Sequence, residues 1–223
     1  MASKTTRLGN SVAVIGLGRF GRSLALELMA GGAEVLAIDA DEAVVQSLTG
    51  RLTHVVTADS TDEESLRQLS VHEFRRAVVA IGTDLESSIL TASILVDFGI
   101  PNIWAKGISN SHAKILAKVG AHHVIRPEHD MGRRVAHLIR GKLQDYIEFE
   151  DDYVIVKTTP PSYLWGVPLA QSSPRTKHRA TVVGIKRPHG GFTYATPDTI
   201  VNRGDIIIVS GQRDDVEKFS NME

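Results

Sequence analysis

The first part of the chain alternates between short apolar runs and longer stretches in which apolar residues recur at helical spacing. A short apolar run is typical of a buried strand, and helical spacing indicates an amphipathic helix. We therefore predict six strands, each followed by a helix. The strands are predicted at residues 12–15, 35–38, 54–57, 77–81, 102–105 and 123–125. One helix is predicted directly after the first strand, and further helices are predicted at about 41–50, 61–69, 85–98 and 111–119.

This regular alternation predicts an α/β domain with a doubly wound parallel sheet. In such sheets ligands bind just outside the carboxyl ends of the strands. One edge of the sheet should therefore carry the residues that lie at or directly after these ends. They are Gly16, Asp39, Asp59, Gly82, Lys106 and Glu128.

The stretch from Val12 to Asp39 carries the most specific pattern. Gly16, Gly18 and Gly21 follow the first strand at the spacing GxGxxG, and Asp39 ends the second strand. Gly16 would allow a tight turn, Gly18 would let a phosphate approach the backbone, and Gly21 would let the helix pack against the strand. The helix N-terminus offers free N–H groups to that phosphate, and Asp39 can accept hydrogen bonds from ribose hydroxyls. The stretch predicts a nucleotide site rather than a glycine turn without a ligand.

Residues 130–147, beyond the sixth strand, are predicted to form one further helix. No later strand of the sheet needs this helix as a connection, so we expect it to cross to a partner subunit rather than to pack on its own domain. Its apolar residues at helical spacing are Met131, Val135, Leu138, Ile139 and Tyr146.

The pattern changes after residue 147, where an acidic linker at 148–152 precedes a second domain. Strands are predicted at 153–157, 181–186 and 205–210, with 192–194 as another, and a short helix begins at residue 214. The chain thus divides into a nucleotide-binding domain at 1–147 and a small α+β domain at 148–223. So short a domain supplies little core of its own, and we expect it to dimerise or dock.

Composition excludes several classes of function. The 223 residues are 42% hydrophobic and 23% charged, and a net charge of −1 gives no global basic field for nucleic acid or an anionic membrane. The absence of cysteine excludes disulfides and thiol catalysis. The start of the chain has no signal-peptide core, and no apolar run approaches the ~20 residues that span a bilayer. We expect no nucleic-acid partner, no membrane insertion, and a membrane role only through a partner.

Three other patterns are rejected as sites of chemistry. Tyr153 and Lys157 match the YxxxK of short-chain dehydrogenases, but on a strand the two side chains would lie ~13 Å apart. His122 and His123 would point to opposite faces of a strand, which makes a poor metal chelate. The basic cluster at 175–179 is interpreted as a solvated loop.

Two charged residues at the ligand edge each keep two interpretations. Arg19 lies inside the glycine loop, where it could reach an extra phosphate, from its own ligand or a neighbouring subunit's, or could simply be solvated. Glu128 could bind a cation beside phosphates or cap the helix that follows it.

Eight motifs together carry a resemblance to a known family. They are Gly-Leu-Gly-Arg-Phe-Gly (16–21), Ile-Asp (38–39), Ala-Asp-Ser-Thr-Asp (58–62), Ile-Trp-Ala-Lys (103–106), His112, Gly-Ala (120–121), Arg-Pro-Glu (126–128) and Asp-Met-Gly (130–132). With them the chain resembles the RCK-type (KTN/TrkA-type) regulatory subunits of bacterial Ktr and Trk potassium uptake systems, and most nearly the cytosolic Ktr ring protein. The resemblance implies a Rossmann-type RCK-N domain and a small RCK-C domain.

The resemblance also implies a function and an assembly. It implies a gating subunit without enzymatic activity, switched by ATP against ADP. Such a subunit forms a homo-octamer, a tetramer of dimers, in which residues 130–147 are the dimer crossover. The ring would lie in the cytoplasm, held at the inner face of the membrane by a potassium-translocating membrane subunit.

The resemblance assigns roles within the nucleotide site. Arg19 would meet the terminal phosphates, across the dimer interface or within its own subunit. Glu128 would sit near the phosphates and help to hold a divalent cation, Mg or Ca, at the dimer interface. The ribose would be held by Asp39, Ala40 and Asp41, the adenine would lie by Asp59 and Ser60, and the remaining site residues would be Gly16, Gly18, Phe20, Gly21, Ile81, Gly82, Thr83, Lys106, Gly107, Ile108 and His112.

Two further ligands follow from relatives within the same family. Several relatives bind cyclic di-AMP in the second domain, but Ser173 and Pro174 stand where those relatives often carry an asparagine and an aliphatic residue, although Arg175 is kept. The resemblance therefore does not extend cyclic di-AMP to this chain. Some Trk relatives prefer NAD(H), which Asp39 suits equally, so the alternative function is an NAD(H)-binding redox sensor or an NAD-dependent oxidoreductase.

Overall fold

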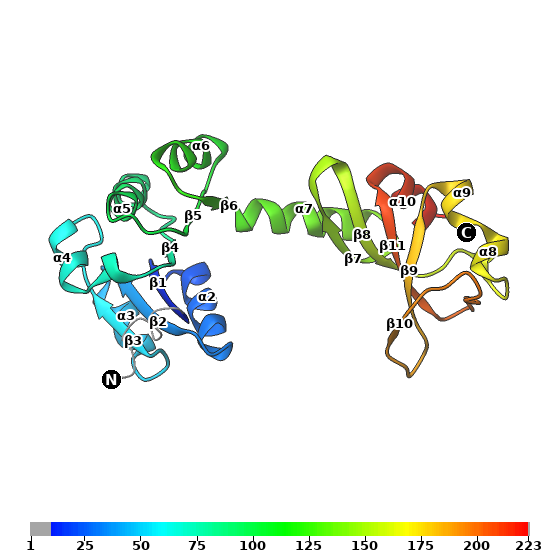
Figure 1. Ribbon diagram of the computed structural model, residues 1–223, viewed down its shortest axis with the longest axis horizontal. Coiled ribbons are helices and arrows are strands. Elements are labelled where there is room, and N and C mark those ends of the chain that lie inside the picture. Colours follow the sequence, from blue (N-terminus) through cyan, green and yellow to red (C-terminus); the bar gives the residue numbers. More distant parts are fainter. Residues whose placement is uncertain (1–9, 223) are drawn as a thin grey trace. The chain divides into compact units, whose positions relative to one another are not determined.

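The computed structural model describes residues 10–222. Two compact units make up the chain, and the boundary between them follows Glu128. Each unit has its own sheet and its own hydrophobic core, and each is described by itself (Figure 1).

The first unit is built on a six-stranded parallel sheet in the order β3-β2-β1-β4-β5-β6. The predicted doubly wound sheet is confirmed, and each strand differs from its predicted bounds by one or two residues at most. The strands are β1 (Ser11–Ile15), β2 (Glu34–Asp39), β3 (His54–Thr57), β4 (Ala77–Val79), β5 (Ile103–Lys106) and β6 (His123–Ile125).

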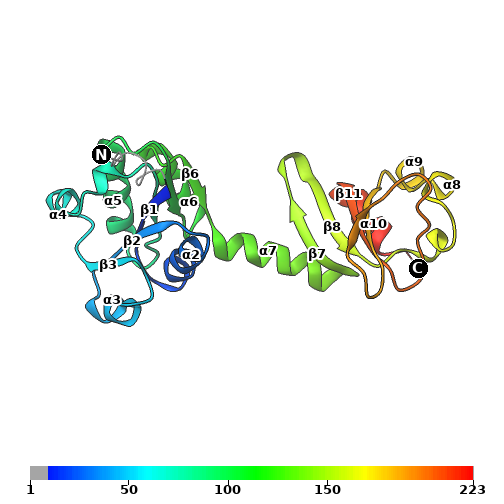
Figure 2. The same cartoon turned by 60° about the horizontal axis from the view of Figure 1, so that its bottom comes forward.

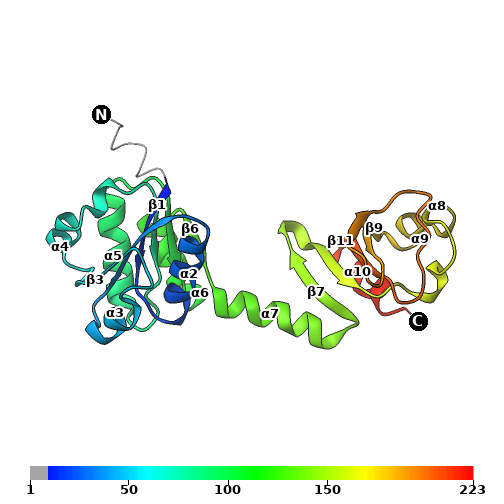
Figure 3. The same cartoon turned by 90° about the horizontal axis from the view of Figure 1, so that it is seen from below.

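Helices connect these strands, and Figure 3 shows them around the first sheet. Asp41, Asp62 and Asp84 accept hydrogen bonds from the first backbone N–H groups of three of them, α3, α4 and α5. The helices are α2 (Arg19–Ala30), α3 (Glu42–Leu48), α4 (Glu63–Gln68), α5 (Leu85–Asp97) and α6 (Asn110–Val119), with a short 3₁₀ turn, η2 (Val71–Glu73).

Alternation along the strands sends apolar side chains to two separate cores. Val12 and Val14 of β1 pack with residues of α2 and α3, whereas Ala13 and Ile15 pack with residues of α4, α5 and α6. Each face of the sheet is therefore fixed by its own helices, and the carboxyl ends of the strands are held at one edge.

The second unit has a five-stranded antiparallel sheet in the order β10-β9-β11-β8-β7, whose strands are labelled in Figure 1. Figure 2 shows β7 and β8 joined as a hairpin. The strands are β7 (Leu143–Glu148), β8 (Tyr153–Thr158), β9 (Thr181–Lys186), β10 (Phe192–Tyr194) and β11 (Ile206–Gln212). The helical elements are α7 (Pro127–Arg140), which begins at the end of the first unit, η3 (Glu150–Asp152), η4 (Ser162–Leu164), α8 (Leu169–Ser172), α9 (Pro174–His178) and α10 (Arg213–Ser220).

The prediction that this unit has little core is wrong. A single cluster of buried apolar side chains joins β7, β8, β9 and β11 to α10, with Phe219, Leu164 and Ile207 among its fully buried members. The sheet and α10 therefore bury enough apolar surface to form a separate hydrophobic core.

The predicted helix at 130–147 is also wrong in its second half. α7 ends at Arg140, Gly141 follows, and β7 then pairs antiparallel with β8, so the sheet of the second unit starts at Leu143. The register shifts between Leu143 and Asp145, and this irregularity leaves Leu143 and Tyr146 buried together. Buried residues three apart imitate helical spacing, which is why the sequence pattern favoured a longer helix.

α7 itself exposes an apolar stripe. All residues of α7 lie in the described range, and none of them is buried. Met131, Val135 and Ile139 lie on one helical face, and Ile139 is 80% exposed. Within residues 10–222, the chain has no helix with both the length and the apolar character needed to cross a bilayer.

Candidate nucleotide-binding site

A cavity of about 610 Å³ lies at the carboxyl ends of the strands of the first sheet. It lies between the loops after β1, β2, β4 and β5 and the start of α7. This is the edge of the sheet at which the topology predicts a ligand. Its lining residues are Gly16, Gly18, Arg19, Phe20, Asp39, Asp41, Val44, Ala80, Ile81, Gly82, Thr83, Lys106, Ile108 and Glu128.

The three glycines of the loop differ in what the protein requires of them. Gly16 has a φ of +92°, and a Cβ there would lie 2.9 Å from the backbone nitrogen of Ile81. A Cβ at Gly21 would lie 1.8 Å from the carbonyl oxygen of Gly16, so α2 packs directly on the turn. A Cβ at Gly18 would meet no described atom within 4 Å. The open backbone at Gly18 is therefore available to a ligand rather than needed for packing.

The N-terminus of α2 adds free donors beside Gly18. Gly18 is the N-cap residue, no described side chain caps this end, and the first turn carries no acidic residue. The first N–H groups of α2 consequently keep hydrogen-bonding capacity and partial positive charge for an anion.

Asp39 holds the glycine loop in place. Its Oδ2 accepts a hydrogen bond from the backbone N–H of Leu17 at 2.5 Å, and its Oδ1 accepts one from that of Asp41 at 2.9 Å. A carboxylate has about four acceptor positions, so Asp39 can still accept from ribose hydroxyls. The carboxylate is thus fixed before any ligand arrives.

The cavity lining also carries the basic side chains Arg19 and Lys106 and the acidic Glu128. Lys106 Nζ lies 2.7 Å from Glu128 Oε1 and 5.8 Å from the centre of the Phe20 ring. The hydrogen bond from Lys106, followed by a backbone hydrogen bond, lowers the pKa of Glu128, and the charges of Lys106 and Arg19 add to that effect. Glu128 is therefore ionised at neutral pH and occupies one hydrogen bond of the lysine.

The lining does not include six of the predicted site residues, which are Gly21, Ala40, Asp59, Ser60, Gly107 and His112. Asp59 Oδ1 accepts from the backbone N–H of Thr61, and the buried Ser60 hydroxyl is hydrogen-bonded to Thr91. These two side chains hold the turn after β3.

His112 and Gly107 support the loop after β5. Nδ1 of the buried His112 accepts from the backbone N–H of Ile108 at 3.4 Å, and burial lowers the pKa of His112. A Cβ at Gly107 would lie 3.0 Å from Cβ of Ala113, so this glycine permits the approach of α6.

Sequence reasoning missed two lining residues, Val44 and Ala80. Ala80 directly precedes the predicted Ile81, and Val44 lies one helical turn after Asp41, so each adjoins a predicted segment. The described residues contain no group of three or more His, Cys, Asp or Glu arranged to hold a metal ion. The expected divalent cation near Glu128 therefore stays a prediction.

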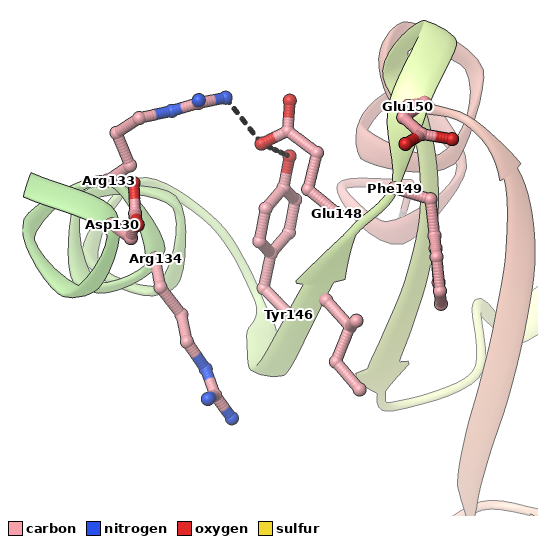
Figure 4. A pocket seen from close by; sticks show the side chains of 8 residues that line it. Asp130, Arg133, Arg134, Tyr146, Glu148, Phe149 and Glu150 are labelled. Atoms are coloured by element: carbon pink, nitrogen blue, oxygen red, sulfur yellow. Dashed lines mark hydrogen bonds and ion pairs between the residues drawn. The ribbon is translucent and has the colours of Figure 1, made fainter. Parts of the chain in front are cut away.

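A second cavity, of about 650 Å³, lies between α7 and the β7–β8 hairpin (Figure 4). Arg133 reaches Glu148 Oε2 at 2.5 Å, and the Tyr146 hydroxyl donates to the same oxygen at 3.2 Å. Burial, with the charge of Glu148 as the next cause, raises the pKa of Tyr146 to about 12. Arg213 also contacts Glu148, so the charges in this cavity are largely satisfied by one another.

Two protein families match the chain. The TrkA-N domain matches residues 12–127, and the TrkA-C domain matches residues 153–222. The Ktr system potassium uptake protein C of Bacillus subtilis (strain 168) is 37% identical over 208 residues, which are 93% of this chain and 94% of that protein. The Ktr system potassium uptake protein A of Vibrio alginolyticus is 34% identical over 91% of this chain and 92% of that protein.

A solved structure shares the fold. The GsuK channel bound to NAD superposes with a TM-score of 0.68 at 16% identity, over 96% of this chain and 40% of that one. The chain thus spans less than half the length of that channel. At this identity the likeness concerns the fold alone.

Proposed function

Because this chain belongs to the family of RCK-type Ktr potassium uptake proteins with TrkA-N and TrkA-C domains, we propose that it is a nucleotide-sensing regulatory subunit of a potassium uptake system. Its partner would be a potassium-translocating membrane subunit, and it would act at the cytoplasmic face of the membrane without catalysing a reaction. The similar Ktr uptake proteins of Bacillus and Vibrio support this assignment.

The observation that carries the proposal is the cavity at the edge of the first sheet. The open backbone of Gly18, the uncapped start of α2 and the charge of Lys106 border one cavity, and Asp39 is fixed beside the same loop by its hydrogen bond from Leu17. Phosphates suit the first three groups, and a ribose suits Asp39. The site residues assigned from the sequence would act in these roles.

A switch between ATP and ADP needs a nucleotide that binds two ring shapes with different affinity. The γ-phosphate is the group that distinguishes the two ligands, and Arg19, exposed in the glycine loop, is the side chain placed to meet it. Arg19 would act on its own ligand or on one held by a neighbouring subunit.

Self-association as a homo-octamer, a tetramer of dimers, forms part of the proposal. Two sets of exposed apolar residues on helices support it: the stripe of α7, and Leu85, Leu90 and Ile115 on the neighbouring helices α5 and α6. Exposed apolar surface on helices marks protein interfaces. The α7 stripe would be the dimer crossover.

Glu128 would supply only part of the ligands of a divalent cation, Mg or Ca. Since the described residues offer no group of three acidic or histidine ligands, the remaining ligands would be phosphate oxygens or groups of a second subunit. Cyclic di-AMP stays outside the proposal.

The second candidate function is an NAD(H)-binding redox sensor. It is favoured by the fixed Asp39, which suits the adenosine ribose of either ligand, and by solved GsuK structures whose ligands are NAD and ADP. An oxidoreductase would need in addition a catalytic base next to the bound nicotinamide.

Titration calorimetry of nucleotide-stripped protein with ATP, ADP, NAD and NADH, with the mass followed by light scattering, tests the proposal. We expect ATP and ADP to bind tightly to an octamer, and Arg19→Ala to weaken ATP more than ADP. Arg51→Ala, at an exposed arginine outside the cavity, is the matched control. Tight NADH with weak ATP, especially on a dimer, would favour the redox sensor instead.

A further inference from the structure

One end of the second sheet carries exposed aromatic and basic side chains that neither the nucleotide site nor the apolar helix surfaces use. It consists of the β9–β10 hairpin, the turn before β11 and Trp165 at the end of η4, and Figure 1 shows the hairpin extending from the sheet. We name its Lys186, Phe192, Tyr194, Trp165 and Arg203 the hairpin surface.

The aromatic side chains of this surface are unusually open to solvent. All three residues of β10 are exposed, and Tyr194 is 91% exposed. Phe192 and Tyr194 are two residues apart on a strand and so lie on the same face. Trp165 is also exposed, although its backbone is held in an isolated bridge to Val201. A folded protein rarely leaves so many large rings uncovered in one place without a partner.

Two cations stand directly over these rings. Lys186 Nζ lies 5.8 Å from the centre of the Phe192 ring, and the Arg203 guanidinium carbon lies 5.9 Å from the Trp165 ring. Among residues 10–222 neither cation forms an ion pair. Their charge is therefore free for an external anion.

The register of the sheet brings both pairs to one end. Lys186 of β9 pairs with Phe192 of β10 on one side and with Ile206 of β11 on the other. Arg203 lies just before β11, and a Cβ at Gly204 would lie 3.8 Å from the ring of Pro188 in the hairpin turn. The turn before β11 thus packs beside the hairpin turn.

The acidic side chains of these segments do not cancel this charge. Asp205 is buried, pairs with Arg187 at 3.3 Å and accepts from the backbone N–H of Asn202, so it serves the turn internally. Asp198 is the other acid between β10 and β11. Lys186 and Arg203 remain as the unpaired charges of the hairpin surface.

We propose that the hairpin surface docks on the headgroup region of an anionic phospholipid bilayer. Rings with an apolar body, flanked by Lys and Arg, are the side chains that favour a membrane interface, where the rings enter the headgroup layer and the cations meet lipid phosphates. The two apolar helix surfaces consist of aliphatic side chains without rings, and they are suited to protein instead. The hairpin surface adds a direct contact to an association that the sequence alone assigned to a membrane partner.

A single copy would bind weakly. Each Lys or Arg close to an anionic surface strengthens binding about fivefold, so the two free cations supply about thirtyfold together. Several copies in one ring would act together and raise the apparent affinity far above that of one. The contact therefore adds to a partner's hold on the subunit rather than replacing it.

The two tryptophans of the chain provide a direct test. In Trp104→Phe full-length protein, Trp165 is the only tryptophan, and its emission reports what surrounds the hairpin surface. With vesicles of phosphatidylcholine and phosphatidylglycerol we expect a blue shift and co-sedimentation, both lost at high salt and both absent with phosphatidylcholine alone. In Trp165→Phe protein, Trp104 should show no shift although the protein still sediments.

Two sets of variants locate the contact. Lys186→Gln with Arg203→Gln should weaken sedimentation about thirtyfold, and Phe192→Ser with Tyr194→Ser at least about tenfold. Arg51→Gln with Arg75→Gln removes the same charge from exposed positions of the first unit and should change binding little. ATP and ADP affinities should be unchanged in every variant, which separates this inference from the nucleotide proposal.

Four results would overturn the proposal. They are the absence of vesicle binding by the wild-type chain, vesicle binding that the hairpin variants do not weaken, release by inorganic phosphate beyond the effect of its ionic strength, and binding of an oligouridine in place of vesicles with the same variant dependence. The third result would assign the cations to a free anion, and the fourth would assign the surface to single-stranded RNA.

Discussion

The ion pair between Lys106 and Glu128 should lower the affinity of the site for nucleotide, because a ligand phosphate must displace Glu128 from Lys106. Lys106 is 11% exposed and Glu128 64% exposed, with 2.7 Å between Nζ and Oε1. A phosphate that recruits Lys106 must compete with this carboxylate. Glu128→Gln keeps an acceptor of similar shape but removes its charge, so the competition should weaken.

The magnitude follows from the exposure of the pair. A largely solvated carboxylate holds a lysine by about 1 kcal/mol or less, which is about a fivefold change in an equilibrium constant. In the presence of a chelator we therefore expect Glu128→Gln to bind ADP up to about fivefold more tightly than the wild type. With Mg²⁺ the order should reverse, since the wild type gains a carboxylate ligand for the cation and the variant does not.

Titration calorimetry with ADP, in chelator and in Mg²⁺, measures both effects on one preparation. Glu73→Gln removes one exposed carboxylate outside the cavity and should change neither affinity. Weaker ADP binding by Glu128→Gln in chelator would refute the reasoning, because it would mean that the carboxylate supports the ligand directly and does not compete with it for Lys106.

Three further predictions concern the glycine loop and His112. In thermal melts, Gly18→Ala should leave the free energy of unfolding within about 1 kcal/mol of wild type, because its Cβ meets no described protein atom. In calorimetry it should weaken ADP binding, because the same Cβ would enter the phosphate position, and equal ADP affinity would place the phosphate elsewhere. Gly21→Ala should lower the free energy of unfolding by about 1–3 kcal/mol, since its Cβ would lie 1.8 Å from the Gly16 oxygen, and a melt like that of Gly18→Ala would contradict this packing. Burial lowers the pKa of His112, so this histidine is protonated more readily in the unfolded chain than in the folded chain. The free energy of unfolding should therefore be full above about pH 6.5 and fall as the pH drops below that value. In melts across this pH range His112→Gln should reduce the fall, and an unchanged fall would assign it to other groups.

The first unit was predictable because its local signals agree with one another. Each strand of the parallel sheet is a short apolar run, and Asp41, Asp62 and Asp84 mark helix starts in the sequence as they do in the structure. The cavity lining followed from the rule that ligands sit beyond strand ends. Of the six strand-end positions expected at this edge, Asp59 alone does not line the cavity, because its side chain is used by its own turn.

The second unit was harder because its signals are not local. Leu143 and Tyr146 share a core face only through the irregular pairing of β7 with β8, and no pattern within β7 shows this. The buried core likewise depends on α10 meeting β8 across about 60 residues of chain. Ser60 and His112 were assigned to the ligand because a motif lists residue types and not the direction in which their side chains point.

The uncapped N-terminus of α2 also ties the survival of the folded chain to its ligand. A side-chain cap is worth about 1 kcal/mol, which α3, α4 and α5 receive from aspartates and α2 does not. A ligand that binds only the folded chain adds about 2.7 kcal/mol at a concentration of 100 times its Kd. Because proteases degrade the unfolded fraction, the proposed function implies that a fall in the nucleotide supply would shorten the lifetime of the chain as well as change its state.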